Sequence, residues 1–351
     1  MGNEDGARAQ GQSRIRRAET YLAQSAALRA RLDLDDAALV PRALGKGEHN
    51  DNYWFEDPRD GRRFVLRINV VPQPFHTDQV AYEHGVLKAL EASGVTPRAL
   101  FKDSSRTIID KDVLVTSFCE GRELDFDRLG DSDVDRAVRL MADVHAVEPP
   151  EHSGIHRPKD PLRTLFDECV GRFREYRSSS ARDERIALWV DRYLRTAEEL
   201  LDTPAPPTSQ ARIVNTETLP SHFLLPEDEA KRGWFIDWER AVEGEVAQDV
   251  AYFVSPTTTF WDSEYRFPRE EVDGLVERYW EAVDGRFERK GFDARLKAWR
   301  VMTALRSTTW FCRALAQRTA DPHAWMTEKA RRKMPAYLSE EFLAELEEIA
   351  R

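Results

Sequence analysis

Residues 212–225 read RIVNTETLPSHFLL, and residues 234–239, after a polar turn, read WFIDWE. Short apolar runs separated by polar residues predict three short strands, at 212–214, 223–225 and 234–238. Asp237 lies near the end of the last strand, and Glu217 lies in the polar stretch between the first two. Carboxylates placed in this way can orient a hydroxyl group and hold Mg²⁺, because hard cations prefer oxygen ligands. The acid at the end of the last strand, Asp237, is therefore the first candidate functional residue.

Nearer the N-terminus, a cation lies in the middle of an apolar strand. The pattern predicts a helix at 77–90 and strands at 40–44, 53–55, 64–68, 98–101 and 113–118. Arg67 falls within the third strand, and Glu83 falls within the helix that follows it. Since an unpaired buried charge is costly, Glu83 is a candidate partner that would hold the guanidinium against a nucleotide phosphate. An exposed arginine and a solvated glutamate are the alternative interpretation.

A glycine-containing turn lies between the first two of these strands. Residues 44–50 read LGKGEHN, and Gly45 and Gly47 would let backbone N–H groups approach a phosphate closely. The turn does not precede a helix, so it is not a dinucleotide-binding fingerprint, and the full P-loop pattern is absent. An ordinary hairpin turn is the other interpretation.

The chain is predicted to be organised in three parts. Residues 1–37 form a polar tail, up to about residue 13, and a helix; residues 38–120 form a small β-rich lobe. Residues 121–351 form a larger lobe in which helices dominate, at 134–145, 161–176, 181–201 and within 268–350. The fold class is therefore α+β.

Composition excludes some classes of partner. The chain has 52 basic and 63 acidic residues, which gives a formal net charge of −11. Proteins that coat nucleic acids or bind anionic membranes need basic surfaces, so this charge argues against both classes. No apolar run is long enough to span a membrane. Three widely spaced cysteines, Cys119, Cys169 and Cys312, form no metal-ligand motif and are expected to be buried and reduced. The sequence therefore predicts a cytoplasmic protein that binds neither nucleic acid nor membrane.

Taken in order, these motifs resemble the aminoglycoside phosphotransferase and choline kinase-like family, a branch of the protein-kinase fold, over roughly residues 38–255. Gly47 and Asn50 match the family's glycine turn, and Arg67 matches its strand cation in a Val-Leu-Arg context. Glu83 matches the helix acid, and Asp237 matches the metal-binding acid. A structural acid further on matches Asp249.

The resemblance implies a two-lobed kinase-like fold. Its smaller lobe would hold an antiparallel sheet with one helix, and its larger lobe would be mostly helical. ATP would be the cofactor, with GTP as the alternative, together with Mg²⁺ or Mn²⁺. Gly45, Gly47, Asn50, Arg67 and Glu83 would form the nucleotide site.

One block departs from the family pattern, in which the catalytic loop reads His-Gly-Asp-Leu-His-Pro-x-Asn. Here residues 215–222 read NTETLPSH, so that Glu217 stands where the family has its catalytic aspartate. His222 stands where the family has a metal-binding asparagine, and histidine suits Mn²⁺ or Zn²⁺ better than Mg²⁺. The resemblance thus assigns catalysis to Glu217, Asp237 and His222, and metal binding to Asp237 and His222.

The expected activity is transfer of the γ-phosphoryl group of ATP to a hydroxyl group of a small molecule. Two alternatives stay open because of the altered loop. One is a pseudokinase that binds nucleotide as a regulatory module, and the other is an enzyme that transfers a nucleotidyl group. The protein would act as a monomer or a homodimer.

The acceptor is expected to lie against the larger lobe. Residues 260–265 read FWDSEY and, with Trp310, offer aromatic and acidic groups that would suit a cationic acceptor. Packing of these aromatic residues in a helical core is the alternative.

Overall fold

The computed structural model describes residues 2–34, 38–46, 50–70, 78–322, 324 and 326–350. The chain divides into two compact units. We call the first the N-terminal unit; it comprises Met1–Gly121, Pro150–Ile155 and Ile236–Glu239. The C-terminal unit comprises Arg122–Pro149, His156–Phe235 and Arg240–Arg351. The Ile-Asp-Trp-Glu motif thus belongs to the N-terminal unit although it lies far along the sequence.

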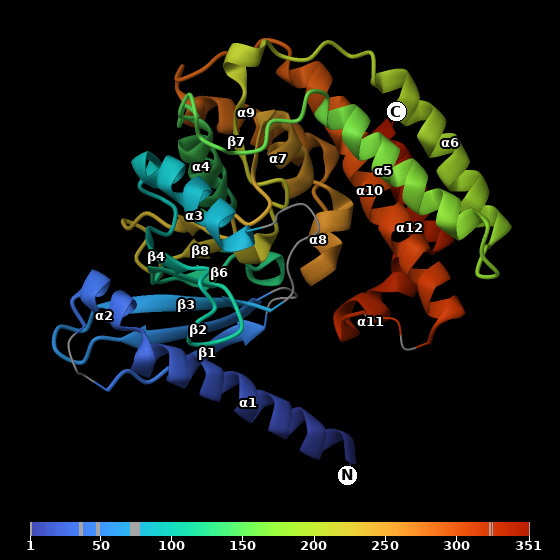
Figure 1. The fold of residues 1–351 in the computed structure, drawn as a ribbon. Helices are drawn as coiled ribbons and strands as arrows, with labels where there is room; N and C mark the ends of the chain where they lie inside the picture. The colour runs from blue at the N-terminus through green and yellow to red at the C-terminus, as the bar shows by residue number, and fades with distance from the viewer. Residues whose placement is uncertain are drawn as a thin grey trace. The chain divides into compact units, whose positions relative to one another are not determined.

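The N-terminal unit is built on a five-stranded antiparallel sheet with the strand order β1-β2-β3-β5-β4 (Figure 1). Its elements are α1 (Gly2–Gln24), α2 (Ala26–Leu32), β1 (Arg42–Lys46), β2 (Asn50–Glu56), β3 (Arg63–Asn69), α3 (Gln79–Leu90), β4 (Ala99–Asp103) and β5 (Val113–Ser117). In β3 the apolar side chains of Phe64, Leu66 and Ile68 are buried, while the intervening positions are partly exposed. This alternation directs Arg67 to the opposite face of the sheet, since side chains alternate along a strand.

Helices α1 and α2 pack against the apolar face of this sheet. Tyr21 and Leu28 share one core cluster with Phe55 and Leu66 of the sheet. The helices are separate because the chain breaks at Ser25, whose hydroxyl accepts a hydrogen bond from Leu28 N at 3.3 Å and caps α2. The polar residues expected to form a tail lie in α1, which begins at Gly2.

The C-terminal unit is mainly helical. Its helices are α4 (Asp133–His145), α5 (Pro161–Arg177), α6 (Glu184–Leu200), α7 (Val246–Phe253), α8 (Pro256–Asp262), α9 (Arg269–Val283), α10 (Phe292–Ala320), α11 (Glu328–Tyr337) and α12 (Glu340–Ala350). Its strands are β6 (Arg122–Glu123), β7 (Arg212–Val214), β8 (Phe223–Leu225), β9 (Trp234–Phe235) and β10 (Val242–Gly244). They pair as β6-β8-β9 and β10-β7, and α5 packs along α10 (Figure 1). A sheet with helices in one unit and mainly helices in the other give the α+β class that the sequence predicts.

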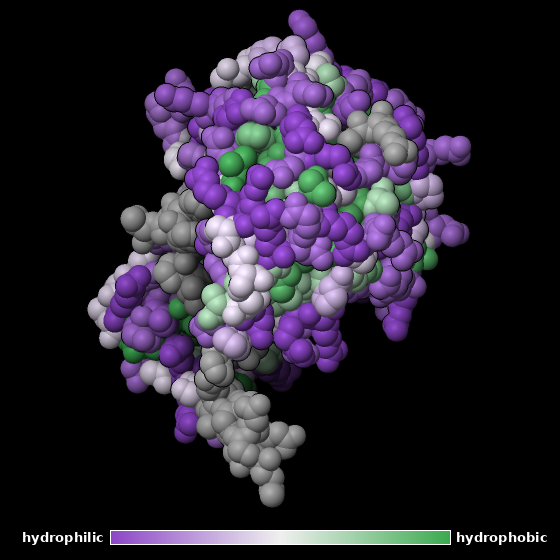
Figure 2. Space-filling view, turned by 90° about the vertical axis from the view of Figure 1, so that its right-hand side faces the viewer, coloured by the Kyte–Doolittle hydropathy of each residue, from purple (hydrophilic) through white to green (hydrophobic). Residues whose placement is uncertain are grey.

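Aromatic side chains form much of the core of the C-terminal unit. Phe223 and Phe235 stack across β8 and β9 with ring centroids 4.5 Å apart, and Phe253 of α7 meets Phe223 edge-on. The side chains of Cys169 and Cys312 are also buried there, as free thiols. Hydrophilic residues cover most of the face shown in Figure 2, with hydrophobic ones in small separate groups. Among the described residues, no helix combines the length and apolar character needed to cross a membrane.

Candidate active site

Arg67 of β3 is the centre of a polar cluster in the N-terminal unit. Its guanidinium donates to Glu83 of α3 at 2.6 Å and to Asp237 and Glu239 at 3.0 Å each. The Arg67 side chain is 15% exposed and that of Glu83 only 5%, so this is a largely buried ion pair. The predicted pairing of Arg67 with Glu83 is therefore present, and the alternative of an exposed arginine is wrong.

Amide side chains extend this cluster. Asn50, at the start of β2, donates from Nδ2 to Glu239 at 2.7 Å and accepts a hydrogen bond from Asn69 at 3.1 Å. Gln79, at the start of α3, donates to the Glu239 carbonyl at 2.8 Å. These contacts hold the Ile-Asp-Trp-Glu segment to β2, β3 and α3. Sequence reasoning missed Glu239, although its place two residues after Asp237 was a usable signal.

The cluster is unbalanced in charge. Three carboxyl groups, on Glu83, Asp237 and Glu239, surround one guanidinium, which leaves a formal charge of −2 when all three are ionised and −1 when Glu83 carries a proton. Arg67 also has a buried Nε without a hydrogen-bond partner among the described residues. A divalent cation would balance the excess carboxylate charge, and a phosphate oxygen would satisfy the orphaned N–H, since buried polar groups need partners. The donor set around Asp237 thus fits Mg²⁺ bound together with a polyphosphate.

The protonation of Glu83 should make stability depend on pH. Burial, together with the Glu239 and Asp237 carboxylates, outweighs the effect of Arg67 and raises the pKa of Glu83 to about 8. In the unfolded chain a glutamate titrates near about 4.3, so the folded protein holds an extra proton between these values. The free energy of unfolding is therefore expected to fall as pH rises through this window, by at most about 1.4 kcal/mol per pH unit. Urea unfolding at a series of pH values measures this slope.

The variant Glu83→Gln is the control for that slope, because it removes the titrating group. Its stability should depend less on pH than that of the wild type between the same limits. Equal slopes in the two proteins would show that Glu83 keeps an ordinary pKa.

Asp237 stands in an unusual backbone conformation. Strand β9 ends at Phe235, and Asp237 has φ of 65°, in the left-handed region. The predicted strand 234–238 is thus too long, because a positive φ cannot continue the extended chain. Such conformations cost energy and often mark functional positions. The turn lets the Asp237 carboxylate reach Arg67 while its side chain stays 33% exposed.

A buried acid, Asp249, binds the backbone of the loop that carries Glu217. Asp249 of α7 accepts hydrogen bonds from Asn215 N at 2.7 Å and from Thr216 N at 2.8 Å. It also lies 3.2 Å from Nε2 of His145, whose other ring nitrogen meets Tyr279 at 2.8 Å. Asp249 and His145 are both fully buried. Asp249 therefore has the structural role that the resemblance implies, and His145 is a hydrogen-bonding core residue.

Glu217 is held by two arginines of the C-terminal unit. Its Oε1 accepts from Arg240 Nη1 at 2.9 Å and from Arg306 Nη2 of α10. Arg306 also donates to the Thr216 carbonyl at 3.1 Å, and Thr216 has φ of 71°, which is rare for a β-branched residue. The glutamate is thus oriented by a fixed frame and remains 27% exposed. Sequence reasoning did not anticipate either arginine.

The structure describes fewer contacts for the remaining predicted site residues, His222, Gly45 and Gly47. His222 ends a short 3-10 helix, Pro220–His222, and its backbone N–H bonds the Leu219 carbonyl at 3.0 Å. Within the described residues no three His, Cys, Asp or Glu side chains are arranged so that they alone could hold a metal ion, so metal binding by His222 stays a prediction. Gly45 lies in β1, opposite Asn52 of β2, and Gly47 lies outside the described residues.

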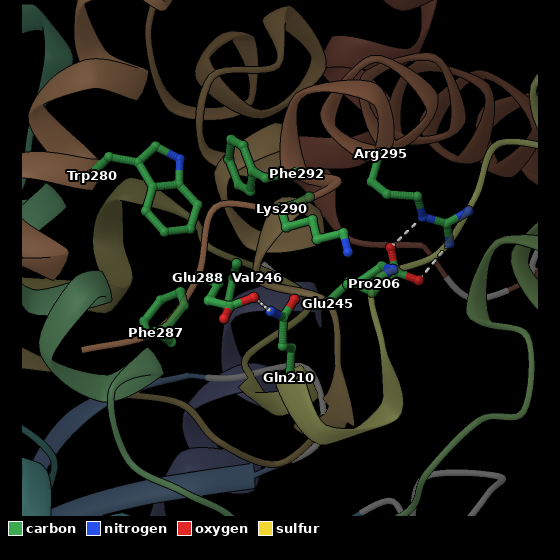
Figure 3. A pocket seen from close by; sticks show the side chains of 11 residues that line it. Pro206, Gln210, Glu245, Val246, Trp280, Phe287, Glu288, Lys290, Phe292 and Arg295 are labelled. Carbon is green, nitrogen blue, oxygen red and sulfur yellow. Dashed lines mark hydrogen bonds and ion pairs between the residues drawn. The ribbon is translucent and has the colours of Figure 1, made fainter. Parts of the chain in front are cut away.

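A separate pocket in the C-terminal unit contains none of the predicted site residues. Trp280, Phe287 and Phe292 border it, as Figure 3 shows. Glu245 at its edge is paired with Arg295, so the charges there are already matched. The pocket therefore does not compete with the two charged clusters as a candidate active site.

Comparisons with known proteins point to one family. Residues 40–295 match the family described as the phosphotransferase enzyme family. No curated protein sequence matches the chain.

Several solved structures share the fold. One is a spectinomycin phosphotransferase in complex with ADP and spectinomycin, with 10% identity over 90% of this chain and 93% of that one, and a TM-score of 0.61. Another is a microcompartment-associated aminopropanol kinase, with 17% identity over 92% and 95%, and a TM-score of 0.62. A choline kinase from Cryptosporidium parvum has 12% identity over 91% and 93%, and a TM-score of 0.59.

The matched residues cover most of the chain and contain Arg67, Glu83, Glu217 and Asp237. The chain therefore belongs to the phosphotransferase enzyme family and has its kinase-like fold.

Proposed function

We propose that the protein transfers the γ-phosphoryl group of ATP to a hydroxyl group of a small molecule. The observation that carries this proposal is the Arg67 cluster, in which a buried strand arginine is held by a helix glutamate and by the acid of the Ile-Asp-Trp-Glu segment. Buried ion pairs contribute little net stability. A protein that had lost its activity would therefore gain little from keeping the buried Arg67 cluster. The pseudokinase alternative is not favoured.

The residues of the N-terminal unit would bind the nucleotide phosphates. Arg67 presents a buried Nε that has no hydrogen-bond partner among the residues the structure describes, and Glu83 and Glu239 hold its guanidinium in place. Asp237 would hold Mg²⁺, which when bound neutralises charge on the transferring phosphoryl group. Phosphoryl transfer depends mainly on such positioning and charge stabilisation.

Glu217 would accept the proton of the acceptor hydroxyl. The hydroxyl oxygen forms a bond to the γ-phosphorus, the bond from that phosphorus to the bridging oxygen breaks, and ADP leaves. Arg240 and Arg306 keep the Glu217 carboxylate in one orientation, which matters because displacements of about 1 Å are costly in catalysis.

Nucleotide binding tests the first half of this proposal without any acceptor. We expect ATP with Mg²⁺ or Mn²⁺ to raise the unfolding temperature of the wild type in a saturable way, because a ligand that binds only the folded state stabilises it. The variant Arg67→Met should lose most of this shift, and Arg313→Gln, on the exposed part of α10, should keep it. Equal shifts in the wild type and Arg67→Met would contradict the assignment of the nucleotide site.

A further inference from the structure

The surroundings of Glu217 are rich in arginine. Within the C-terminal unit, Arg240 after β9 and Arg306 of α10 pair with Glu217, and Arg172 of α5 contacts the backbone of Arg306, so we treat the three arginines as one group. Arg172 donates from Nη1 to the Arg306 carbonyl at 3.5 Å, which links α5 to α10. Among the described residues the group has two carboxylate partners, Glu168 and Glu217, and so keeps a formal charge of +1.

In the described part of the chain, one donor of these arginines is orphaned and another arginine is partly open to solvent. Arg240 makes one ion pair in the described part of the chain, through Nη1, and its side chain is 31% exposed. Arg172 is 11% exposed, and its Nε is buried without a hydrogen-bond partner among the described residues. An orphaned guanidinium N–H is costly unless a ligand accepts from it. Arg172 therefore offers an orphaned N–H, and Arg240, which pairs with Glu217, offers a partly exposed guanidinium.

Electrostatics favour an anion at the same place. Burial, and then the like charges of Arg306 and Arg240 opposed by Glu168, lower the pKa of Arg172. An arginine whose pKa is depressed is one whose charge is poorly compensated. An added negative charge would relieve this, whereas an added positive charge would increase the repulsion.

The alternative region for a cationic acceptor is already filled by the protein's own cations. Lys329 lies 5.0 Å from the Trp261 ring and pairs with Asp262. Lys333 lies 4.1 Å from the Phe260 ring and pairs with Glu264 at 3.4 Å. The aromatic and acidic groups that suggested a cation from sequence are thus matched internally.

We propose that the hydroxyl acceptor of this phosphotransferase carries an oxyanion, a carboxylate or a phosphate, which Arg172 and Arg240 bind. The inference rests on the proposed function, because it assigns these arginines to the acceptor. It replaces the expectation of a cationic acceptor. The recognised chemistry is a planar or tetrahedral oxyanion, for which the arginine fork is well suited.

Binding of simple oxyanions tests the proposal without nucleotide or turnover. Malonate represents the carboxylate and inorganic phosphate represents the phosphate, titrated at constant ionic strength into the full chain and followed by calorimetry. Ethanolamine serves as the cationic probe. We expect saturable binding of malonate or phosphate, and the tighter of the two identifies the anionic group.

The double variant Arg172→Gln/Arg240→Gln should weaken that binding at least about tenfold, because both charged guanidinium groups that would bind the anion are lost. Arg240→Gln alone, at a partly exposed side chain, should fold normally and show a smaller loss in the same direction. The matched control Arg313→Gln lies on α10 with an exposed Glu175 partner and should bind as the wild type does.

Anion binding that is equal in the wild type and the double variant would overturn the proposal, as would no saturable binding of either anion. Tighter binding of ethanolamine than of both anions would also overturn it. Because no phosphoryl transfer is involved, these outcomes are distinct from a failure of the proposed function, which would appear as absent nucleotide binding or absent product.

Discussion

Replacing Asp237 by Asn is expected to lower the rate of phosphoryl transfer by about 10²–10³-fold or more, the usual loss on removing a group that stabilises charge in the transition state. Asn cannot supply the negative carboxylate that would hold Mg²⁺ and that meets Arg67 at 3.0 Å. The fold should survive, since Asp237 is 33% exposed and Asn tolerates its φ of 65°.

The measurement for Asp237→Asn is the rate of ADP formation with a mixture of hydroxyl acceptors, together with the unfolding temperature. Asp202→Asn, at an exposed position after α6, removes the same charge outside the cluster and should leave the rate unchanged. An undiminished rate in Asp237→Asn would refute the assignment of Asp237.

Replacing Glu217 by Gln is expected to lower the turnover number by about 10²–10⁴-fold, the range typical of a lost general base. Gln keeps an oxygen that Arg240 and Arg306 can hydrogen-bond, so the loop should stay in place while the proton acceptor is lost. Glu199→Gln, on the exposed side of α6, is the control.

The variant Glu217→Asp tests whether the family's usual aspartate gives a higher turnover number than Glu217. The shorter side chain would withdraw the carboxylate from both arginines, and a displacement of about 1 Å can cost about 100-fold. We therefore expect Asp to be worse than Glu at this position, although Asp is the family's usual residue. An increase in turnover in Glu217→Asp would show that the arginine frame does not position the carboxylate for catalysis.

The sequence predicts much of the N-terminal unit because its signals are local. Arg67 interrupts an apolar strand, Glu83 lies on the next helix, and the structure joins them at 2.6 Å. The helical start at Gly2 could not be predicted in the same way, since residues 1–13 lack an apolar stripe, the usual signal for a surface helix. The predicted range of strand β9 was too long because periodicity does not reveal the positive φ of Asp237.

The charged partners of Glu217 lie beyond what sequence reasoning can provide. Arg306 is 89 positions away on a different helix, and Arg240 is 23 positions away after a turn. Among the 52 basic residues of the chain, spacing alone does not select these two. Only the packing of α10 in the C-terminal unit brings Arg306 to the loop, so the change from a cationic to an anionic acceptor required the structure.

The most direct test of the central claim is mass spectrometry of both products from one reaction. The wild type, ATP and Mg²⁺ or Mn²⁺ are incubated with hydroxyl acceptors matched in size but differing in charge, and Asp237→Asn is run in parallel. We expect ADP and an acceptor that has gained one phosphoryl group, formed by the wild type and not by Asp237→Asn. Release of pyrophosphate with a nucleotidylated acceptor, or saturable ATP binding without product from any acceptor, would contradict the account.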